Sequence, residues 1–505
     1  FGHGKACEYR AGMAVGALDF VVLGTYLLLM LVLGGWLGRG NRSAQDYLLG
    51  GRGLPWWALL LSIVATETST ATFLSVPGIA CAGLPSATGD LRYLQLPLGF
   101  LAGRALAAHW LVPRFRTGAL GSAYELLQRH SGRTVQRLAS GLFLVTRTVA
   151  DGLRLWLCAV VLQTLLACNQ ATAVAATALV TLAYTVFGGL RAVVWTDVVQ
   201  FGIYLLGAGA ALWVLHGALP EGLGTALATA ASAPDFRVLD WGFDLANPYT
   251  VWAGVFGGAL LSLGTHGVDH LVVQRVLSAR TTRDAQRAVL WSGPVVLLQF
   301  ALFLVLGLGL SQYYAAHPPA EPFARGDQVF PHFLVHHLPS GLRGLVLGAL
   351  FAAAMSTLSS SLSASASALV HDFLVPWSGR ADDAVWQLRA ARWATLGFGG
   401  LQVTVALGDF GGGAAVVNQV LGIATVTTGV ILGLFGLSLS PACGPRHAAF
   451  GALAGLVTVA LVFWVLPHWF ELAWPWRGCL SSGATLLGGF GSFAWQRLRP
   501  SHAPW

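Results

Sequence analysis

Charged residues are scarce in this chain of 505 residues: Asp, Glu, Lys and Arg together supply 10% of it. A typical soluble domain carries about 25%, so the composition excludes an ordinary soluble globular protein. No stretch is long and polar enough to form a separate soluble domain. Instead, 55% of the residues are hydrophobic and the mean hydropathy is +0.66. Apolar runs of roughly 20 residues, a length that crosses a bilayer, recur from end to end. We expect an all-α polytopic membrane protein.

Signatures of other protein classes are also missing. The six cysteines are scattered without a CxxC pair, so neither a disulfide framework nor a metal site is expected. The net charge of +8 is attributed to basic loops of a membrane protein, because no nucleic-acid-binding motif accompanies it. No nucleophile elbow or metal-ligand spacing is present. We therefore expect no enzyme, no nucleic-acid partner and no organic cofactor.

Apolar segments divide the chain into about thirteen expected membrane spans. They cover residues 14–38, 56–83, 93–113, 138–168, 170–187, 194–217, 250–274, 287–312, 342–372, 389–408, 414–438, 447–466 and 479–496.

The distribution of Lys and Arg predicts the orientation of these spans. One set of loops, with the C-terminal tail, holds 19 of the 29 basic residues, and the opposite loops with the N-terminus hold seven. Because cytoplasmic loops carry the excess, we expect the N-terminus outside a bacterial inner (cell) membrane and the tail, residues 497–505, in the cytoplasm. Residues 1–13 differ in character from the rest of the chain and are interpreted as a non-native N-terminal extension, with Met13 as a candidate start.

A stripe of hydroxyls runs along the segment "FAAAMSTLSSSLSASAS", residues 351–367. Ser356, Ser360, Ser363 and Ser367 are spaced 4, 3 and 4 apart, which puts them on one face of a helix. A hydroxyl in hydrocarbon needs a partner, so this face should point inward. It either packs helices closely or supplies oxygen ligands to a cation such as Na+.

Two other apolar segments are interrupted by polar residues. The second span contains "ATETSTAT" with Glu67, and the seventh contains "GTHGVDH" with His266 and Asp269. Charged residues at membrane depth are usually functional. Two broken spans five helices apart suggest an inverted repeat of five helices each, with a transport site at the bilayer midplane. Asp197, at the mouth of the sixth span, is either a helix-start carboxylate or a cation ligand.

The sequence resembles the sodium:solute symporter family, which has the LeuT-type inverted-repeat fold. The resemblance lies in "YLLGGRGLPWWAL", "YTVFGGLRAVVWTDVVQ", "VVQRVLSARTTRDAQRA", "AAAMSTLSSSL" and "IATVTTGVILGLFGL", and it includes the family's sodium/sugar, sodium/proline and sodium/sialic acid branches. It implies a first repeat at residues 56–217 and a second at 250–438. The first helix, 14–38, and the two C-terminal helices, 447–496, would be peripheral.

The resemblance also implies sodium ligands. A first site would be formed by the carbonyls of Ala65, Thr68 and Ala353 and the hydroxyls of Ser356 and Thr357. A second site, present in some members, would be formed by Asp197, Ser356, Ser359 and Ser360. One or two Na+ per transport cycle are therefore expected, as coupling ion and not as a resident cofactor.

The fourth span carries Arg147, Asp151 and Arg154 at spacings of 4 and 3, so these residues share a helix face. They form either a self-neutralising triad or a site where an arginine binds an anionic group. Glu67 and Asp269 add negative charge nearby, which would instead suit sodium, a proton or a cationic group. Where the family's sugar carriers have a large amide, an ungapped match places Thr72, which weakens a simple hexose assignment. The expected pocket residues are Glu67, Thr72, Arg147, Asp151, Arg154, His266 and Asp269.

The sequence thus predicts a sodium-coupled symporter that imports a small polar solute by alternating access. The solute would be a sugar, a polyol, an acidic sugar or an organic acid. A proton-coupled carrier of the same fold, with Glu67, Asp197 or Asp269 as relay, and a proline-like amino-acid symporter remain alternatives. The expected partners are the solute, Na+ and membrane lipids, and the chain is expected to work as a monomer.

Overall fold

The computed structural model describes residues 16–81, 84, 88–117, 120–166, 168–408 and 416–498. Within these residues the regular structure is all helical, with no strand; Leu54 and Ala279 make an isolated backbone bridge. The expected extension, residues 1–13, lies outside the described residues, as does all of the expected tail beyond Leu498.

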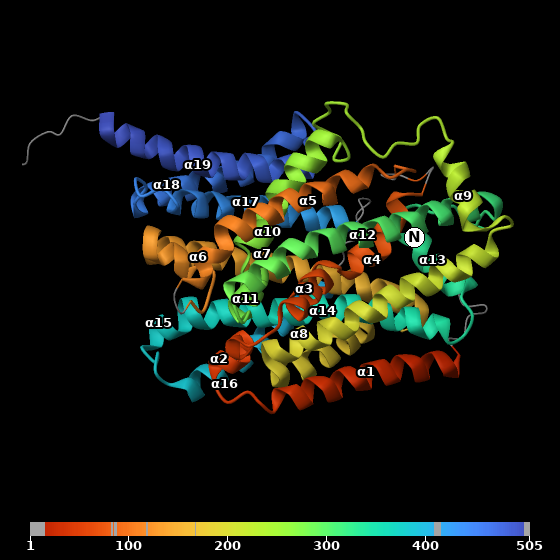
Figure 1. The fold of residues 1–505 in the computed structure, drawn as a ribbon, viewed down its shortest axis with the longest axis horizontal. Helices are drawn as coiled ribbons and strands as arrows, with labels where there is room; N and C mark the ends of the chain where they lie inside the picture. The colour runs from red at the N-terminus through yellow and green to blue at the C-terminus, as the bar shows by residue number, and fades with distance from the viewer. Residues whose placement is uncertain are drawn as a thin grey trace, which may run out of the picture.

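The longer helices occupy the segments that hydropathy predicts, in the same order (Figure 1). They are α1 (Ala17–Gly38), α3 (Trp56–Glu67), α4 (Thr70–Ile79), α5 (Gln95–Leu106), α7 (Glu125–Leu166), α8 (Gln170–Ala218), α10 (Gly258–Gly267), α11 (His270–Ser278), α12 (Thr282–Ala316), α14 (Leu342–Leu369), α16 (Ala384–Ala406), α17 (Val416–Ser438), α18 (Pro445–Ala460) and α19 (Trp474–Leu498).

Shorter helices and turns connect them. They are α2 (Ala44–Leu49), η2 (Gly50–Arg52), η3 (Arg92–Leu94), η4 (Ala107–Leu111), α6 (Val112–Arg116), α9 (Gly222–Ala231), η5 (Trp252–Gly257), η6 (Gly326–Gln328), α13 (Val329–His337), η7 (Val370–Leu374), α15 (Val375–Ser378), η8 (Leu461–Val465) and η9 (Leu466–His468).

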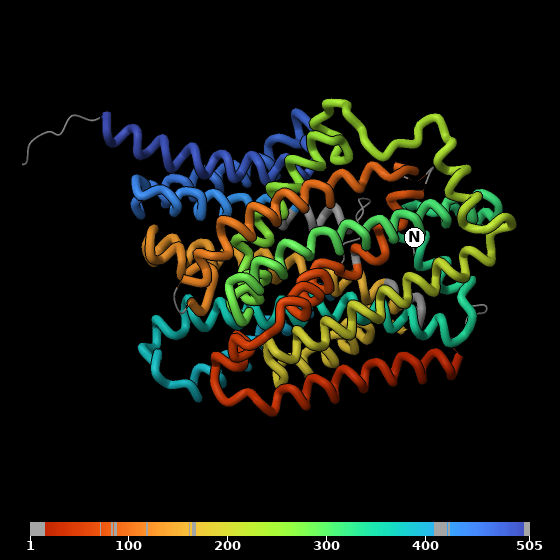
Figure 2. The backbone as a smooth tube through the Cα atoms, viewed as in Figure 1, coloured from red at the N-terminus to blue at the C-terminus, as the bar shows by residue number. Residues whose placement is uncertain are grey.

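Helix α14 is the centre of the molecule. Every residue from 346 to 368 is buried, and the helix packs most extensively against α8, with α7, α16 and α3 around it. Helix α1 lies along one edge against α8 and α14, whereas α18 and α19 form the opposite edge with α17 (Figure 2). The hydroxyl-rich sequence of α14 therefore faces protein on all sides, as the inward-facing stripe requires.

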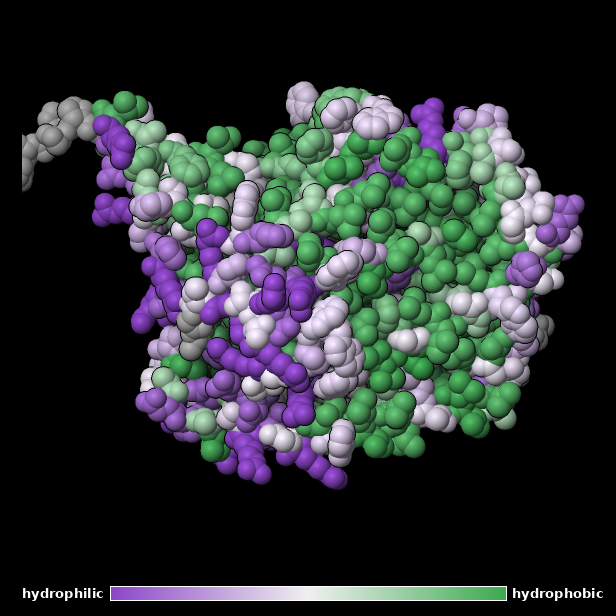
Figure 3. All heavy atoms as spheres, in the orientation of Figure 1, coloured by the Kyte–Doolittle hydropathy of each residue, from purple (hydrophilic) through white to green (hydrophobic). Residues whose placement is uncertain are grey.

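The outer surface suits a lipid environment. Large apolar side chains such as Phe20, Trp213 and Leu298 are exposed, and Figure 3 shows a broad hydrophobic surface with hydrophilic residues gathered toward the left-hand end. Among the described residues, five helices are long and apolar enough to span a membrane, or up to six if α3 and α4 count as one bent span. These candidates, chosen by length and composition, do not establish the count of thirteen expected spans.

Two of the long helices bend at a glycine. Helix α7 bends at Gly132 (φ 83°) and α8 at Gly189 (φ 62°), backbone conformations that other residues rarely adopt. At Gly189 a Cβ would also lie 2.7 Å from the Tyr47 carbonyl oxygen. This close approach anchors α2 against the bend of α8.

Both polar interruptions are breaks in a helix. Helices α3 and α4 meet at a bend of 65°, with Thr68 and Ser69 outside both. Helices α10 and α11 are separated by Val268 and Asp269. The prediction that these two segments are interrupted is confirmed, and each break leaves backbone groups without a helical partner.

Candidate functional site

The first break faces the hydroxyl stripe of α14. The Ser356 hydroxyl lies 2.8 Å from the Ala65 carbonyl oxygen and 3.5 Å from that of Ala353. The Thr357 hydroxyl lies 3.1 Å from the Thr66 carbonyl and 3.3 Å from that of Ala353. The structure thus brings together four of the five residues expected at the first sodium site.

Thr68, the fifth residue, makes different contacts. Its hydroxyl donates to the Val64 carbonyl at 2.9 Å and lies 2.5 Å from the Gln299 amide nitrogen. In this conformation the Thr357 hydroxyl of α14 contacts the carbonyl of Thr66. The cluster of Ala65, Thr66, Ala353, Ser356 and Thr357 offers only neutral oxygens, the ligands that hard cations take.

Asp197, in α8, is fully buried. Its Oδ2 atom accepts a hydrogen bond from the Ser62 hydroxyl at 2.5 Å and another from Ser360 at 3.4 Å. The Ser359 hydroxyl points elsewhere, to the Ser356 carbonyl at 3.2 Å. Of the residues expected at a second sodium site, Ser360 is therefore the one that contacts the aspartate.

The main partner of Asp197 is Arg275, a residue that the hydropathy pattern places in a cytoplasmic loop. That placement is wrong: Arg275 belongs to α11 and is fully buried. Its guanidinium lies 3.0 Å from Asp197 Oδ2 and also donates to Ser62 and Thr66, both at 2.7 Å. One side chain of α11 thereby ties α3 to α8.

The signal for Arg275 is present in the sequence but weak. Valine and leucine continue on both sides of it, in "HLVVQRVLS", so the apolar pattern extends past the boundary drawn at residue 274. A charge at the end of an apolar run usually marks the membrane interface. Here it marks a buried ion pair, because Asp197 on another helix compensates it.

A cavity of about 100 Å³ lies beside the two breaks. Six of the seven expected pocket residues line it: Glu67, Thr72, Arg147, Arg154, His266 and Asp269. Three hydroxyl residues, Thr66, Ser69 and Thr265, also line it. Apolar and aromatic side chains complete the wall: Ile63, Tyr93, Leu96, Phe100, Leu261, Leu271, Val272 and Phe300. The cavity therefore combines an apolar body with a few charged groups, as small-molecule sites do.

Each ionised group in this wall has a counter-charge. Glu67 Oε2 lies 2.5 Å from the guanidinium of Arg104, which is buried and also donates to Ser292 at 2.7 Å. His266 approaches the same carboxylate at 3.7 Å. The hydropathy pattern places Arg104 within a span but gives it no partner.

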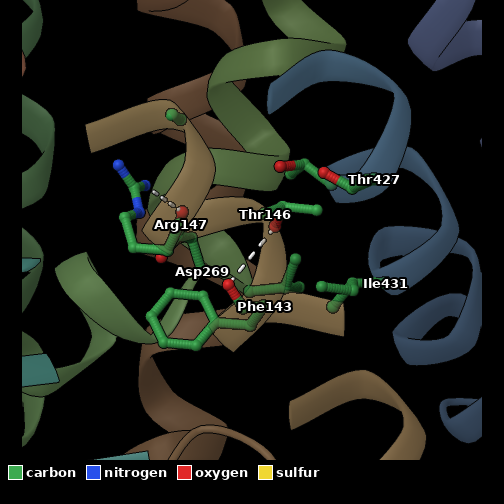
Figure 4. Close-up of a pocket in the computed structure, with 9 residues that line it drawn as sticks. Phe143, Thr146, Arg147, Asp269, Thr427 and Ile431 are labelled. Carbon is green, nitrogen blue, oxygen red and sulfur yellow. Dashed lines mark hydrogen bonds and ion pairs between the residues drawn. The ribbon is translucent and has the colours of Figure 1, made fainter. Parts of the chain in front are cut away.

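The second group of charges is a chain of four residues. Arg147 lies 2.7 Å from Asp269 and 3.6 Å from Asp151, and Asp151 also pairs with Arg154. Asp151 is fully buried and lies behind the wall. Figure 4 shows Arg147 and Asp269 directed toward one another, with Thr427 and Ile431 of α17 nearby. The three residues of the fourth span are thus paired with one another, and Asp269 extends the chain of charges across the break.

Arg154 is the least satisfied member of this chain. Its one described ion-pair partner is Asp151, which it shares with Arg147, and its buried Nε atom has no hydrogen-bond partner among the described residues. The side chain nevertheless faces the cavity. A planar guanidinium with free donors is suited to a carboxylate.

The formal charges around the cavity cancel. Three carboxylates, of Glu67, Asp151 and Asp269, face three guanidiniums, of Arg104, Arg147 and Arg154.

Comparison with known proteins finds transporters among the relatives of this chain. The sodium/iodide cotransporter of Homo sapiens is 29% identical over 91% of this chain and 71% of that protein. Sodium-coupled monocarboxylate transporter 2 of Bos taurus is 28% identical over 88% of this chain and 72% of that protein. Both relatives are transporters, not enzymes.

The fold is similar to that of a solved Na+-coupled sialic acid symporter in a substrate-bound outward-open state. The TM-score is 0.86 at 23% identity, and the alignment covers 95% of this chain and 98% of the other. The family model of the sodium:solute symporters matches residues 47–458. Because that match covers most of the chain, the protein belongs to the sodium:solute symporter family, whose members couple solute transport to Na+.

Proposed function

We propose that this chain imports a small monocarboxylate together with Na+ by alternating access. The observation that carries the proposal is the charge balance of the cavity beside a cluster of neutral oxygens. A buried net charge is costly, so a bound sodium ion favours a monoanion over a neutral or cationic solute. Binding of either one then strengthens binding of the other by the same factor.

The coupling sodium is assigned to the cluster of Ala65, Thr66, Ala353, Ser356 and Thr357, with Thr68 as a further carbonyl donor. Hydroxyls of α14 and carbonyls from the end of α3 meet there within hydrogen-bond distance. For Asp197 and the serines around it we propose a different role. In this conformation Asp197 is the counter-ion of Arg275, so one Na+ per cycle is sufficient.

Arg154 is proposed to bind the solute carboxylate, with Thr72 offering a further hydroxyl from the cavity wall. The cavity of about 100 Å³ limits the size of the solute: an apolar cavity of about 150 Å³ accommodates benzene. Carboxylates of three or four carbons therefore fit better than sugars of a dozen heavy atoms. Iodide and monocarboxylates, which name two of the relatives, are also small anions.

We further propose the orientation and internal repeat that the sequence suggests. The basic end, with exposed Arg42, Arg280 and Arg283, would face the cytoplasm of a bacterial inner membrane, with the N-terminus outside. The repeats would cover residues 56–217 and 250–438, and the unit would act as a monomer among membrane lipids.

The test is uptake of radiolabelled L-lactate into proteoliposomes that contain the purified protein. Inward Na+ gradients should drive accumulation, and K+ gradients of the same size should not. Lactamide, which has nearly the same size and no charge, is the matched competitor and should inhibit at least about tenfold more weakly than unlabelled lactate, a difference of roughly 1.4 kcal/mol.

Two outcomes contradict the proposal. Lactamide that competes as well as lactate would show that charge does not select the solute. Uptake that is equal in Na+ and K+ would remove the sodium site from the mechanism, and a parallel series at different external pH would then test the proton-coupled alternative.

A further inference from the structure

Three histidines gather on α13, the short helix between α12 and α14. The imidazole rings of two of them, His332 and His336, are stacked, with their centroids 4.0 Å apart and an angle of 21° between the ring planes. The helix lies outside the expected spans 287–312 and 342–372, at the end of the molecule opposite the basic end (Figure 1). No residue of α13 lines the cavity of the proposed function, so the cluster is separate from the transport site.

The backbone of α13 leaves the outer nitrogen of His336 free for a ligand. His336 Nδ1 lies 2.8 Å from the carbonyl oxygen of His332, and a carbonyl only accepts hydrogen bonds, so Nδ1 carries a proton. In the neutral ring, Nε2 then holds the lone pair. The side chain is exposed, so an ion from solution can reach it.

A phenol on α12 orients the second ring. The Tyr314 hydroxyl lies 2.7 Å from His332 Nδ1, and the two rings lie edge to face. A partner on one nitrogen fixes the ring and leaves the other nitrogen for a metal ion, an arrangement typical of metal-binding histidines. Burial, together with His336 and His337 nearby, lowers the pKa of His332 to about 4. This imidazole is therefore neutral near pH 7, the form that binds metals.

The third histidine of the helix is used elsewhere. His337 Nδ1 lies 3.1 Å from the Tyr313 hydroxyl, and its ring centroid is more than 6 Å from those of His332 and His336. Among the described residues, no three His, Cys, Asp or Glu side chains form a group that could hold a metal ion. A bound ion would therefore have two protein ligands and keep water at its other positions.

The donor set selects the kind of ion. Positions i and i+4 lie on one side of a helix, and imidazole ligands suit Zn2+, Cu2+ and Ni2+. Ca2+ and Mg2+ take oxygen ligands instead. The carboxylate nearest in sequence, of Asp327, is buried and pairs with Arg325.

We propose that α13 carries a two-histidine site for a divalent transition metal ion such as Zn2+, with Nε2 of His332 and Nε2 of His336 as ligands. The ion joins residues one turn apart and so fixes the second half of the helix. This matters because α13 is shorter than the roughly 12–15 residues below which an isolated helix is marginal in water. On its other side, Phe330 packs against Phe73 of α4 at 5.4 Å. The bound ion thus stabilises a helix that lies against α4.

The experiment measures Zn2+ binding to the purified full chain in lipid nanodiscs by isothermal titration calorimetry. Tyr314→Phe removes the hydroxyl that orients His332 and should weaken binding by about tenfold. His336→Ala removes a ligand and should weaken it further. His109→Ala is the matched control: His109 is exposed and makes the same contact to the carbonyl four residues before it, at 2.8 Å, but residues 105 and 113 are not histidines.

Hydrogen exchange followed by mass spectrometry localises the bound ion. At a Zn2+ concentration tenfold above its Kd, the backbone amides of residues 329–337 should exchange up to about tenfold more slowly, because opening of the helix releases the ion. Mg2+ at the same concentration should have no effect. Since this comparison uses the unsubstituted chain, it holds even where a variant fails to fold.

The outcomes decide the site independently of lactate uptake. Zn2+ binding and slowed exchange of α13 that are lost in His336→Ala and kept in His109→Ala support it. Equal Zn2+ affinity of folded His336→Ala and the unsubstituted chain overturns it. So does Zn2+ that binds without changing the exchange of α13, since the ion is then held elsewhere on the protein.

Discussion

The two helix breaks meet at the same cavity but differ in chemistry. Just before the first break, at Thr68 and Ser69, the end of α3 presents the carbonyls of Ala65 and Thr66 to hydroxyls of α14. The second, at Val268 and Asp269, presents a carboxylate that is paired with an arginine. Both following helices are capped by a side chain: the Thr72 N–H donates to Ser69 at 3.4 Å and the Leu271 N–H to Asp269 at 2.9 Å.

This difference matches two kinds of cargo. Neutral oxygens suit a cation, because they can replace the water oxygens of its hydration shell. In the proposed function, the guanidiniums of the second region bind an anionic solute. Arg275 connects the two regions, since it belongs to the helix after the second break and donates to Ser62 and Thr66 of the helix before the first.

The largest effect is expected from Arg275→Gln, which removes the connection and leaves Asp197 buried without its counter-charge. Loss of one partner of a buried pair costs about 3–5 kcal/mol, so the thermal midpoint of the purified protein should fall by many degrees. Arg280→Gln is the control, because Arg280 is exposed and donates to the Gly53 carbonyl at the protein surface.

A double substitution sharpens this prediction. Asp197→Asn added to Arg275→Gln removes the unpaired charge and should recover part of the lost stability. If the double variant is no more stable than Arg275→Gln alone, the ion pair is not what Arg275 contributes.

Thr357→Ala should have the next largest effect and should act on the first region alone. It removes one hydroxyl ligand of the proposed sodium site, and interactions with a charged group are worth about 1.5–3 kcal/mol. The Na+ concentration for half-maximal uptake should rise about tenfold or more, with little change in lactate affinity at saturating Na+.

Ser365→Ala is the matched control for Thr357→Ala. Ser365 is buried in the same helix, and its hydroxyl has no hydrogen-bond partner among the described residues. Its removal should leave the Na+ dependence unchanged. An equal shift in both variants would assign the effect to packing of α14 and not to a sodium ligand.

Arg154→Gln should act on the second region. The guanidinium is replaced by a neutral amide, so lactate affinity should fall by about tenfold or more, the value of one charge-assisted hydrogen bond. Inhibition by lactamide should change little, and the ratio of the two inhibition constants is the quantity to measure. An equal loss of affinity for lactate and for lactamide would mean that Arg154 serves only in a structural ion pair with Asp151.

The sequence predicted most of the architecture because hydrophobic segments and polar interruptions are local signals. The breaks at Thr68 and Asp269 and the inward orientation of Ser356 follow from residues within a single helix. The shared helix face of Arg147 and Arg154 is equally local.

The ion-pair partners of the buried arginines could not be predicted from such local signals. Arg104 pairs with Glu67, and Arg275 with Asp197, across separations of 37 and 78 residues. Neither pairing has a periodic signature, since each depends on how helices from different parts of the chain pack. For the same reason the spacing alone could not decide that Arg147 lies closer to Asp269 than to Asp151.

The smallest effect is expected from Ser69→Ala, which removes the cap of the helix after the first break. Helix caps are worth about 0.5–2 kcal/mol, and the hydrogen bond of 3.4 Å is longer than that at Asp269, so the lower end applies. The Na+ concentration for half-maximal uptake should rise about twofold, the equivalent of roughly 0.4 kcal/mol, because α4 starts less firmly beside the sodium site. Asn169→Ala removes the cap of α8, which accepts from the Thr172 N–H at 2.8 Å far from either break, and should leave the Na+ dependence unchanged. A shift for Asn169→Ala as large as that for Ser69→Ala would mean that general helix stability, and not the local geometry of the first break, sets the sodium affinity.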